Sequence, residues 1–105
     1  MNDRELLEAV AKAIGMNVFD WIPGRSGFAH GDSITNRWNP LTDDGDALRL
    51  AVNRGFVVNV WRTAGKVFAG KEDGDGATEE FFDDASAEVA TRRAIVRAAA
   101  AMDIG

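Results

Sequence analysis

The chain has 105 residues, of which 46% are hydrophobic and 28% are charged, and these values predict one folded domain over residues 1–105. Its 12 basic and 17 acidic residues give a net charge of −5, which argues against nucleic-acid binding because such binding needs clustered basic side chains. The sequence contains no cysteine, so disulfides, thiolate nucleophiles and cysteine metal sites are excluded. With no signal-peptide pattern and no apolar run near the roughly 18 residues of a membrane span, we expect a location in the cytoplasm and no contact with a membrane.

The first part of the chain predicts a helix, a strand and a long loop. Residues 3–14 place apolar side chains at helical spacing on one face, namely Leu6, Leu7, Val10 and Ile14. Residues 17–22 are rich in β-branched and aromatic side chains and predict a short strand. Residues 23–37 contain three glycines and little regular pattern, which predicts a loop of unusual length with room for a short strand around Phe28. Such a loop either carries function or is a plain surface excursion, and both interpretations stay open.

A second helix is predicted after the segment that begins at Trp38. Thr42 is its expected N-cap, because a hydroxyl oxygen can accept from the free N–H groups of the first turn, and Gly55 is its expected end. Three aspartates near the start suit the positive end of the helix dipole. The expected buried stripe consists of Ala47, Leu48, Ala51 and Val52.

Three strands and a long helix are predicted for the rest of the chain. Residues 56–62 form the strongest strand pattern, a turn at 63–65 leads to a strand at 66–69, and residues 78–82 predict a third strand. Trp61 has the opposite parity to Val58 and Val60, so we expect it on the other face of the sheet, covered there by a helix. The last helix is expected over residues 84–102. Its cap is Asp84, its outer face carries Arg92, Arg93 and Arg97, and its buried side carries Ala85, Val89, Val96 and Ala99.

The order of these elements, α-β-loop-α-β-β-β-α, predicts an α+β fold. We expect a small antiparallel β-sheet of three or four strands that is flanked by helices. No internal repeat or low-complexity segment interrupts the pattern, which again favours a single domain.

Groups able to perform chemistry are scarce. His30 is the only histidine, and tyrosine and cysteine are absent, which leaves little for general acid–base catalysis. Neither glycine–lysine pair, at 65–66 or at 70–71, is followed by the Ser or Thr of a phosphate-binding loop. Residues 73–77 begin like a calcium loop but have alanine where the third ligand belongs. We therefore expect no catalytic residue, no metal site and no cofactor.

Two features suit the binding of a partner. Eight acidic residues and no basic residue lie between Glu72 and Glu88, which predicts either a solvated loop and helix start or a surface that meets a basic partner. Trp38 stands beside Arg37, and a partly exposed tryptophan next to an arginine is typical of interaction hot spots; an anchor for the loop is the alternative. The candidate partner-binding residues are Trp38, Arg37, Glu79, Glu80, Asp83 and Asp84.

Two blocks of the sequence resemble small proteins of bacteriophages, including those called phage ABA-sandwich proteins. The first block is residues 38–52, with its Trp-Asn-Pro and Asp-Ala pairs, and the second is residues 90–100, with an Ala-Ile-x-Arg-Ala core. The Glu-Leu-rich helix expected over residues 3–14 fits the same pattern. The resemblance implies an α/β/α sandwich that is encoded by a phage or prophage and located in the cytoplasm of the bacterial host. It implies no activity and transfers no functional residue.

Elimination and this resemblance together predict a non-enzymatic phage accessory protein of undetermined oligomeric state. Its expected partner is a protein of the host or the phage, and a component of antiviral defence is one such target. A second hypothesis is a protein that binds and sequesters a nucleotide, with Arg25, His30 and Arg37 placed around the phosphates. A third hypothesis is a minor component of the virion or of its assembly.

Overall fold

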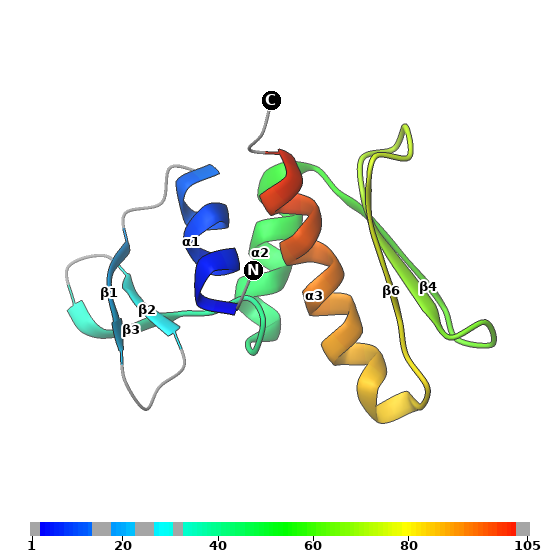
Figure 1. Cartoon of the computed structure of the whole chain (residues 1–105), viewed down its shortest axis with the longest axis horizontal. Coiled ribbons are helices and arrows are strands. Elements are labelled where there is room, and N and C mark those ends of the chain that lie inside the picture. The colour runs from blue at the N-terminus through cyan, green and yellow to red at the C-terminus, as the bar shows by residue number, and fades with distance from the viewer. Residues whose placement is uncertain (1–2, 14–17, 23–26, 31–32, 103–105) are drawn as a thin grey trace.

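The computed structural model describes residues 3–13, 18–22, 27–30 and 33–102, which form three helices and two antiparallel sheets (Figure 1). In chain order the elements are α1 (Asp3–Ala13), β1 (Val18–Ile22), β2 (Gly27–His30), β3 (Ser33–Trp38), α2 (Asp44–Arg54), β4 (Val57–Trp61), β5 (Lys66–Gly70), β6 (Gly76–Glu80) and α3 (Asp84–Met102). The predicted α+β class is confirmed. So are the order of the helices, the three-stranded meander after α2, and the packing of helix on sheet.

The core is built around α3, which packs against α1, α2, β5 and β6. Because α3 has neighbours on more than one side, it needs small side chains that allow close approach, and Ala94, Ala98 and Ala99 are almost fully buried. The buried side chains facing them include Leu7 and Val10 of α1, Leu50 of α2, and Val67 and Ala69 of β5. The alanine-rich end of the sequence is therefore a packing feature of the central helix.

The layers are arranged differently from the expected helix–sheet–helix sandwich. In Figure 1 the sheet of β4, β5 and β6 lies on one side of the helices, and the sheet of β1, β2 and β3 lies on the other. Among the described residues, α3 covers one face of the β4–β6 sheet while no helix covers the opposite face. Trp61 lies on that opposite face and is 50% exposed. The prediction that Trp61 faces away from Val58 and Val60 is therefore confirmed, but the prediction that a helix covers it is wrong.

The β1–β3 sheet occupies part of the segment that we expected to be a loop. Within residues 23–37, β2 pairs with β1 and β3 in antiparallel register, with Phe28 opposite Trp38 and Ala29 opposite Arg37. The register shifts once in each pair, which is typical of short, irregular strands. β2 has only four residues and begins with glycine, and β3 is mostly polar, so the alternation that identifies a strand in sequence is weak here.

The N-cap residues of two helices differ by one position from the prediction. Asp43, not Thr42, caps α2: its backbone is extended, with φ −117° and ψ 120°, and its carboxylate accepts from the Asp46 N–H at 2.8 Å. Thr42 instead closes a turn, because its N–H donates to the Asn39 carbonyl at 3.1 Å. At α3 the carboxylate of Asp83 accepts from the Ser86 N–H at 2.8 Å, so the capping role predicted for Asp84 belongs to Asp83.

The buried faces of α2 and α3 also differ in part from the predicted stripes. In α2, Ala47, Leu50 and Ala51 are buried, whereas Leu48 is 64% and Val52 is 71% exposed. The cause is that α3 is the main packing partner of α2 among the described residues, so one face of α2 is covered far more than the others. In α3, Val96 and Ala99 are buried as predicted, but Val89 is 49% exposed; the side chains of Ile14 and Ala85 lie outside the described part of the chain.

Candidate functional site

An open apolar groove lies between α2, β4 and α3. Its volume is about 470 Å³, and its apolar lining comes from Ala47, Leu48, Ala51, Val58, Val60 and Ile95. Pockets of this size that combine apolar walls with a few polar groups are typical binding sites. A second concavity, lined by residues 62–65 and 81–83, has a volume of only about 240 Å³.

The groove exists because the helices leave the inner face of β4 partly uncovered. In the β4–β5–β6 register, Val58 lies opposite Ala69 and Val60 opposite Val67, so all four side chains share the inner face of the sheet. Val67 and Ala69 are fully buried under α3, yet Val58 and Val60 remain 37% and 45% exposed. The inner face of the edge strand β4 is thus left uncovered beside α2.

The opposite wall is the exposed side of α2. Leu48 points to the groove, and Val52 lies one helical turn beyond it on the same side of the helix. Large exposed apolar side chains that gather in one place mark interaction sites more reliably than scattered ones. Three of the seven exposed large hydrophobic side chains among the described residues line the groove, namely Leu48, Val58 and Val60, and a fourth, Val52, lies one turn from Leu48.

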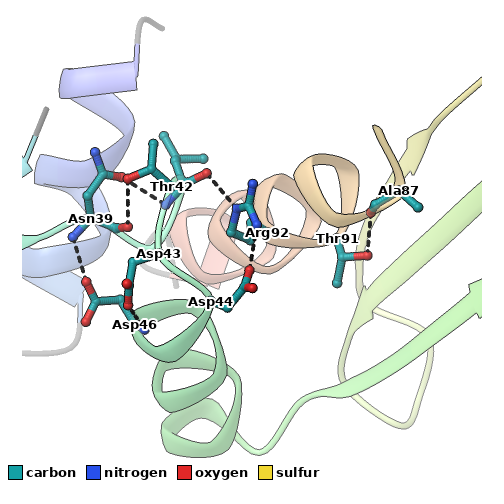
Figure 2. A network of polar contacts seen from close by, with 9 residues as sticks. Asn39, Thr42, Asp43, Asp44, Asp46, Ala87, Thr91 and Arg92 are labelled. Carbon is teal, nitrogen blue, oxygen red and sulfur yellow. Dashed lines mark hydrogen bonds and ion pairs between the residues drawn. The ribbon is translucent and has the colours of Figure 1, made fainter. Parts of the chain in front are cut away.

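Four charged residues contribute to the lining of the groove: Asp44, Arg62, Glu88 and Arg92. Asp44 and Arg92 form an ion pair at 2.5 Å, and the Arg92 Nε also donates to the Leu41 carbonyl at 3.0 Å (Figure 2). Glu88 of α3 and Arg62 of the segment after β4, both exposed, also line the groove. The Thr91 hydroxyl donates to the Ala87 carbonyl at 2.8 Å, so it is held against its own helix. The rim therefore offers charges of both signs around an apolar floor.

A buried polar network fixes the start of α2 and hence one wall of the groove (Figure 2). Asp46 accepts from the Asn39 N–H at 2.9 Å, and the Asn39 side-chain oxygen accepts from the Leu41 N–H at 2.9 Å. Asp46 also pairs with Arg49 at 2.7 Å. Asn39 and Asp46 are only 3% and 9% exposed, so these two residues of the 38–52 block serve the fold.

The predicted acidic surface is partly used for structure. Glu79 forms an ion pair with Arg97 of α3, and Asp83 caps the same helix. Glu80 is exposed on the outer face of the sheet, in the same cross-strand row as Lys66 and Trp61. The backbone of Asp84 begins α3, and its side chain lies outside the described part.

The other predicted site residues belong to the far side of the molecule. Arg37 and Trp38 are on β3 and His30 is on β2, whereas Arg25 lies outside the described residues. Figure 1 shows β3 and β6 on opposite sides of the helices. The six residues proposed for partner binding therefore do not share one surface, because Trp38 and Arg37 are separated from the acidic group by the helical layer.

Sequence reasoning missed the groove. Its signal was present in β4, where five consecutive residues carry no charge, but we assumed that helices cover both faces of the sheet. Leu48 and Val52 were assigned to the core because they fit the helical spacing. Only the packing partner of α2 decides which of the apolar positions on that helix are buried.

The described residues contain no group of three or more His, Cys, Asp and Glu side chains that could hold a metal ion. At the start of the 73–77 loop, the Asp73 carboxylate accepts from the Asp75 N–H at 3.0 Å, which is an ordinary turn interaction. Among the helices in the described ranges, none is long and apolar enough to cross a membrane.

Comparisons with protein-family models, with curated proteins and with solved structures return no match for this chain. The resemblance to phage ABA-sandwich proteins therefore stays a prediction.

Proposed function

We propose that the protein acts by binding another protein in the groove between α2, β4 and α3, and that it performs no catalysis. The observation that supports this proposal is the exposure of Leu48, Val58 and Val60 around one concavity. An apolar centre with a charged rim is the usual composition of a protein-binding surface. The site has no histidine, and its acidic groups are engaged in an ion pair or lie at the rim.

The expected partner presents an apolar segment with a basic residue at one end. The apolar side chains would fill the groove, and the basic group would lie against Glu88, the exposed acidic residue on its rim. Charge complementarity of this kind chiefly improves the rate and specificity of association. If the resemblance to phage proteins holds, the partner is a protein of the bacterial host, and an antiviral defence component is a specific form of this proposal.

The test is capture of partners from host lysate by the tagged protein, compared with two substituted forms. Leu48→Arg places a charge in the groove wall, and because Leu48 is 64% exposed the substitution should leave folding intact. Val89→Arg is the matched control, since Val89 is an exposed apolar residue of α3 outside the groove lining. A partner that is lost with Leu48→Arg and kept with Val89→Arg supports the groove. Equal capture by both forms would refute it.

Trp38→Ala, examined in the same experiment, tests the other candidate surface. Loss of the partner with Trp38→Ala and its retention with Leu48→Arg would move the binding site to the β1–β3 sheet.

A further inference from the structure

The strand β4 is an unprotected sheet edge. The sheet order β4–β5–β6 leaves β4 with a neighbour on one side only, so the backbone groups along its other side have no strand partner among the described residues. Its pairing with β5 runs through five consecutive residues without a register shift. An edge that is regular, uncharged and apolar is a template for a further strand, because natural edges are usually protected by charges, bulges or proline.

The other edge of the same sheet is protected. β6 carries Glu79 and Glu80, and Glu79 is tied to Arg97 of α3. Charged side chains on an edge strand disfavour the addition of a further strand. The charge distribution therefore directs association to β4, whose sequence is Val-Val-Asn-Val-Trp.

We propose that β4 pairs antiparallel with β4 of a second copy of the chain, which would join the two β4–β6 sheets into one six-stranded sheet. A two-fold axis perpendicular to the sheet keeps the helices of both copies on the same face. Directly opposite residues of the two strands must then point to the same face. The axis therefore has to lie midway between the two copies of one residue of β4. Only the axis at Asn59 pairs all five residues of the strand.

This register is complementary on both faces of the sheet. On the inner face, Val58 lies beside Val60 of the second copy. On the outer face, Val57 lies beside Trp61 of the second copy, whose ring is half exposed in a single chain. Both kinds of pair, aliphatic and aliphatic–aromatic, stabilise antiparallel sheets. The contact is isologous and closes on itself, so it yields a dimer and not a fibre.

The charged residue next to β4 is also compatible with this register. Arg62, the first residue after the strand, falls opposite Phe56 of the second copy, where a guanidinium can lie on an aromatic ring. No charged residue of 56–62 falls opposite a like charge. The inner faces of the two β4 strands also become continuous, so the groove of one copy extends toward that of the other.

The absence of cysteine from the chain permits a direct test. Directly opposite residues of antiparallel strands have Cα atoms about 4.5–5.5 Å apart, within the range of disulfides, about 4.4–6.8 Å. With Asn59→Cys the two new thiols would meet at the axis, and mild oxidation should give a covalent dimer. Thr78→Cys is the matched control, because Thr78 and Asn59 flank Phe68 on the same face, one on each edge of the sheet.

Sedimentation equilibrium of the unmodified chain gives the second measurement. We expect the mass to rise with concentration from 11.3 kDa toward twice that value. Asn59→Lys opposes two like charges at the axis and should raise the dimer Kd about tenfold or more, whereas Thr78→Lys should leave it unchanged. A chain that stays monomeric, a dimer that tolerates Asn59→Lys, or equal cross-linking through Thr78→Cys would overturn the proposal.

The dimer does not depend on the proposed function. Leu48→Arg, across the groove from β4, is expected to abolish partner capture while leaving the dimer. If instead capture survives that substitution and the dimer persists, the proposed function fails and the dimer stands.

Discussion

Removal of the Asp46 carboxylate would test how α2 is anchored. The carboxylate is 11% exposed and has two roles. It accepts from the buried Asn39 N–H at 2.9 Å, and it pairs with Arg49, whose side chain is 73% exposed, at 2.7 Å. These roles make different contributions to stability, and they can be separated by substitution.

The buried hydrogen bond should dominate. Asp46→Ala leaves the Asn39 N–H without an acceptor in a buried site, which costs about 1–3 kcal/mol. The ion pair with Arg49 is largely exposed on one side, so its loss adds only about 0–1 kcal/mol. We therefore expect Asp46→Ala to lower the free energy of unfolding by about 1–4 kcal/mol. Arg49→Ala, which removes only the ion pair, should lower it by no more than about 1 kcal/mol.

Asp46→Asn is the conservative control. Its side-chain oxygen can still accept from the Asn39 N–H, so we expect its effect to lie near that of Arg49→Ala. The assay is urea unfolding followed by circular dichroism, with the midpoint compared at constant m-value. If Arg49→Ala destabilises as much as Asp46→Ala, the ion pair and not the buried acceptor anchors α2, and the reasoning is refuted.

Two further predictions concern packing and backbone conformation, and thermal unfolding measures both. Leu7→Ala removes a fully buried side chain and should cost about 2–5 kcal/mol, whereas Leu48→Ala, at a 64% exposed position, should stay within about 0.5 kcal/mol of the original stability. Equal losses of stability in the two variants would show that Leu48 is buried in the core. Gly55 and Gly65 have almost the same φ, +69° and +68°. A Cβ atom at Gly65 would lie 2.6 Å from the Phe81 carbonyl oxygen, whereas a Cβ atom at Gly55 would meet nothing within 4 Å. Gly55→Ala should therefore cost about 1 kcal/mol for its left-handed backbone, and Gly65→Ala should cost clearly more; equal effects would contradict the close approach.

Local patterns in the sequence were sufficient for most elements of the second half. The Phe56–Arg62 pattern predicted β4, the Thr63-Ala64-Gly65 turn predicted the hairpin, and Gly55 ends α2 with φ +69° as expected. These features depend on residues that are neighbours in the chain. Backbone preference and side-chain alternation therefore carry enough information to place them.

Features that depend on distant residues were not predictable in the same way. Leu48 and Leu50 are both leucines of one helix, yet the first is 64% and the second 2% exposed, because α3 covers only one side of α2. The spacing alone gave the wrong choice between them. Likewise, nothing local indicates that the outer face around Trp61 has no helix over it.

The candidate site likewise combines features that neighbouring residues predict with features that depend on distant residues. The aspartates near the start of α2 were predicted to serve that helix start, and Asp43 caps it. The contact of Asp46 with the Asn39 N–H was not predicted. The acidic stretch was predicted to be either a solvated loop and helix start or a binding surface, and two of its members have structural roles: Glu79 pairs with Arg97, and Asp83 caps α3. A run of like charges in sequence does not reveal which members have partners elsewhere in the fold.

Hydrogen–deuterium exchange of the captured complex, compared with the free protein, tests the central claim most directly. If the partner occupies the groove, amides in residues 44–52, 57–62 and 87–95 should exchange more slowly in the complex, while those of β2 and β3 should be unchanged. Protection confined to the β1–β3 sheet, with none in these three segments, would contradict the groove as the binding site.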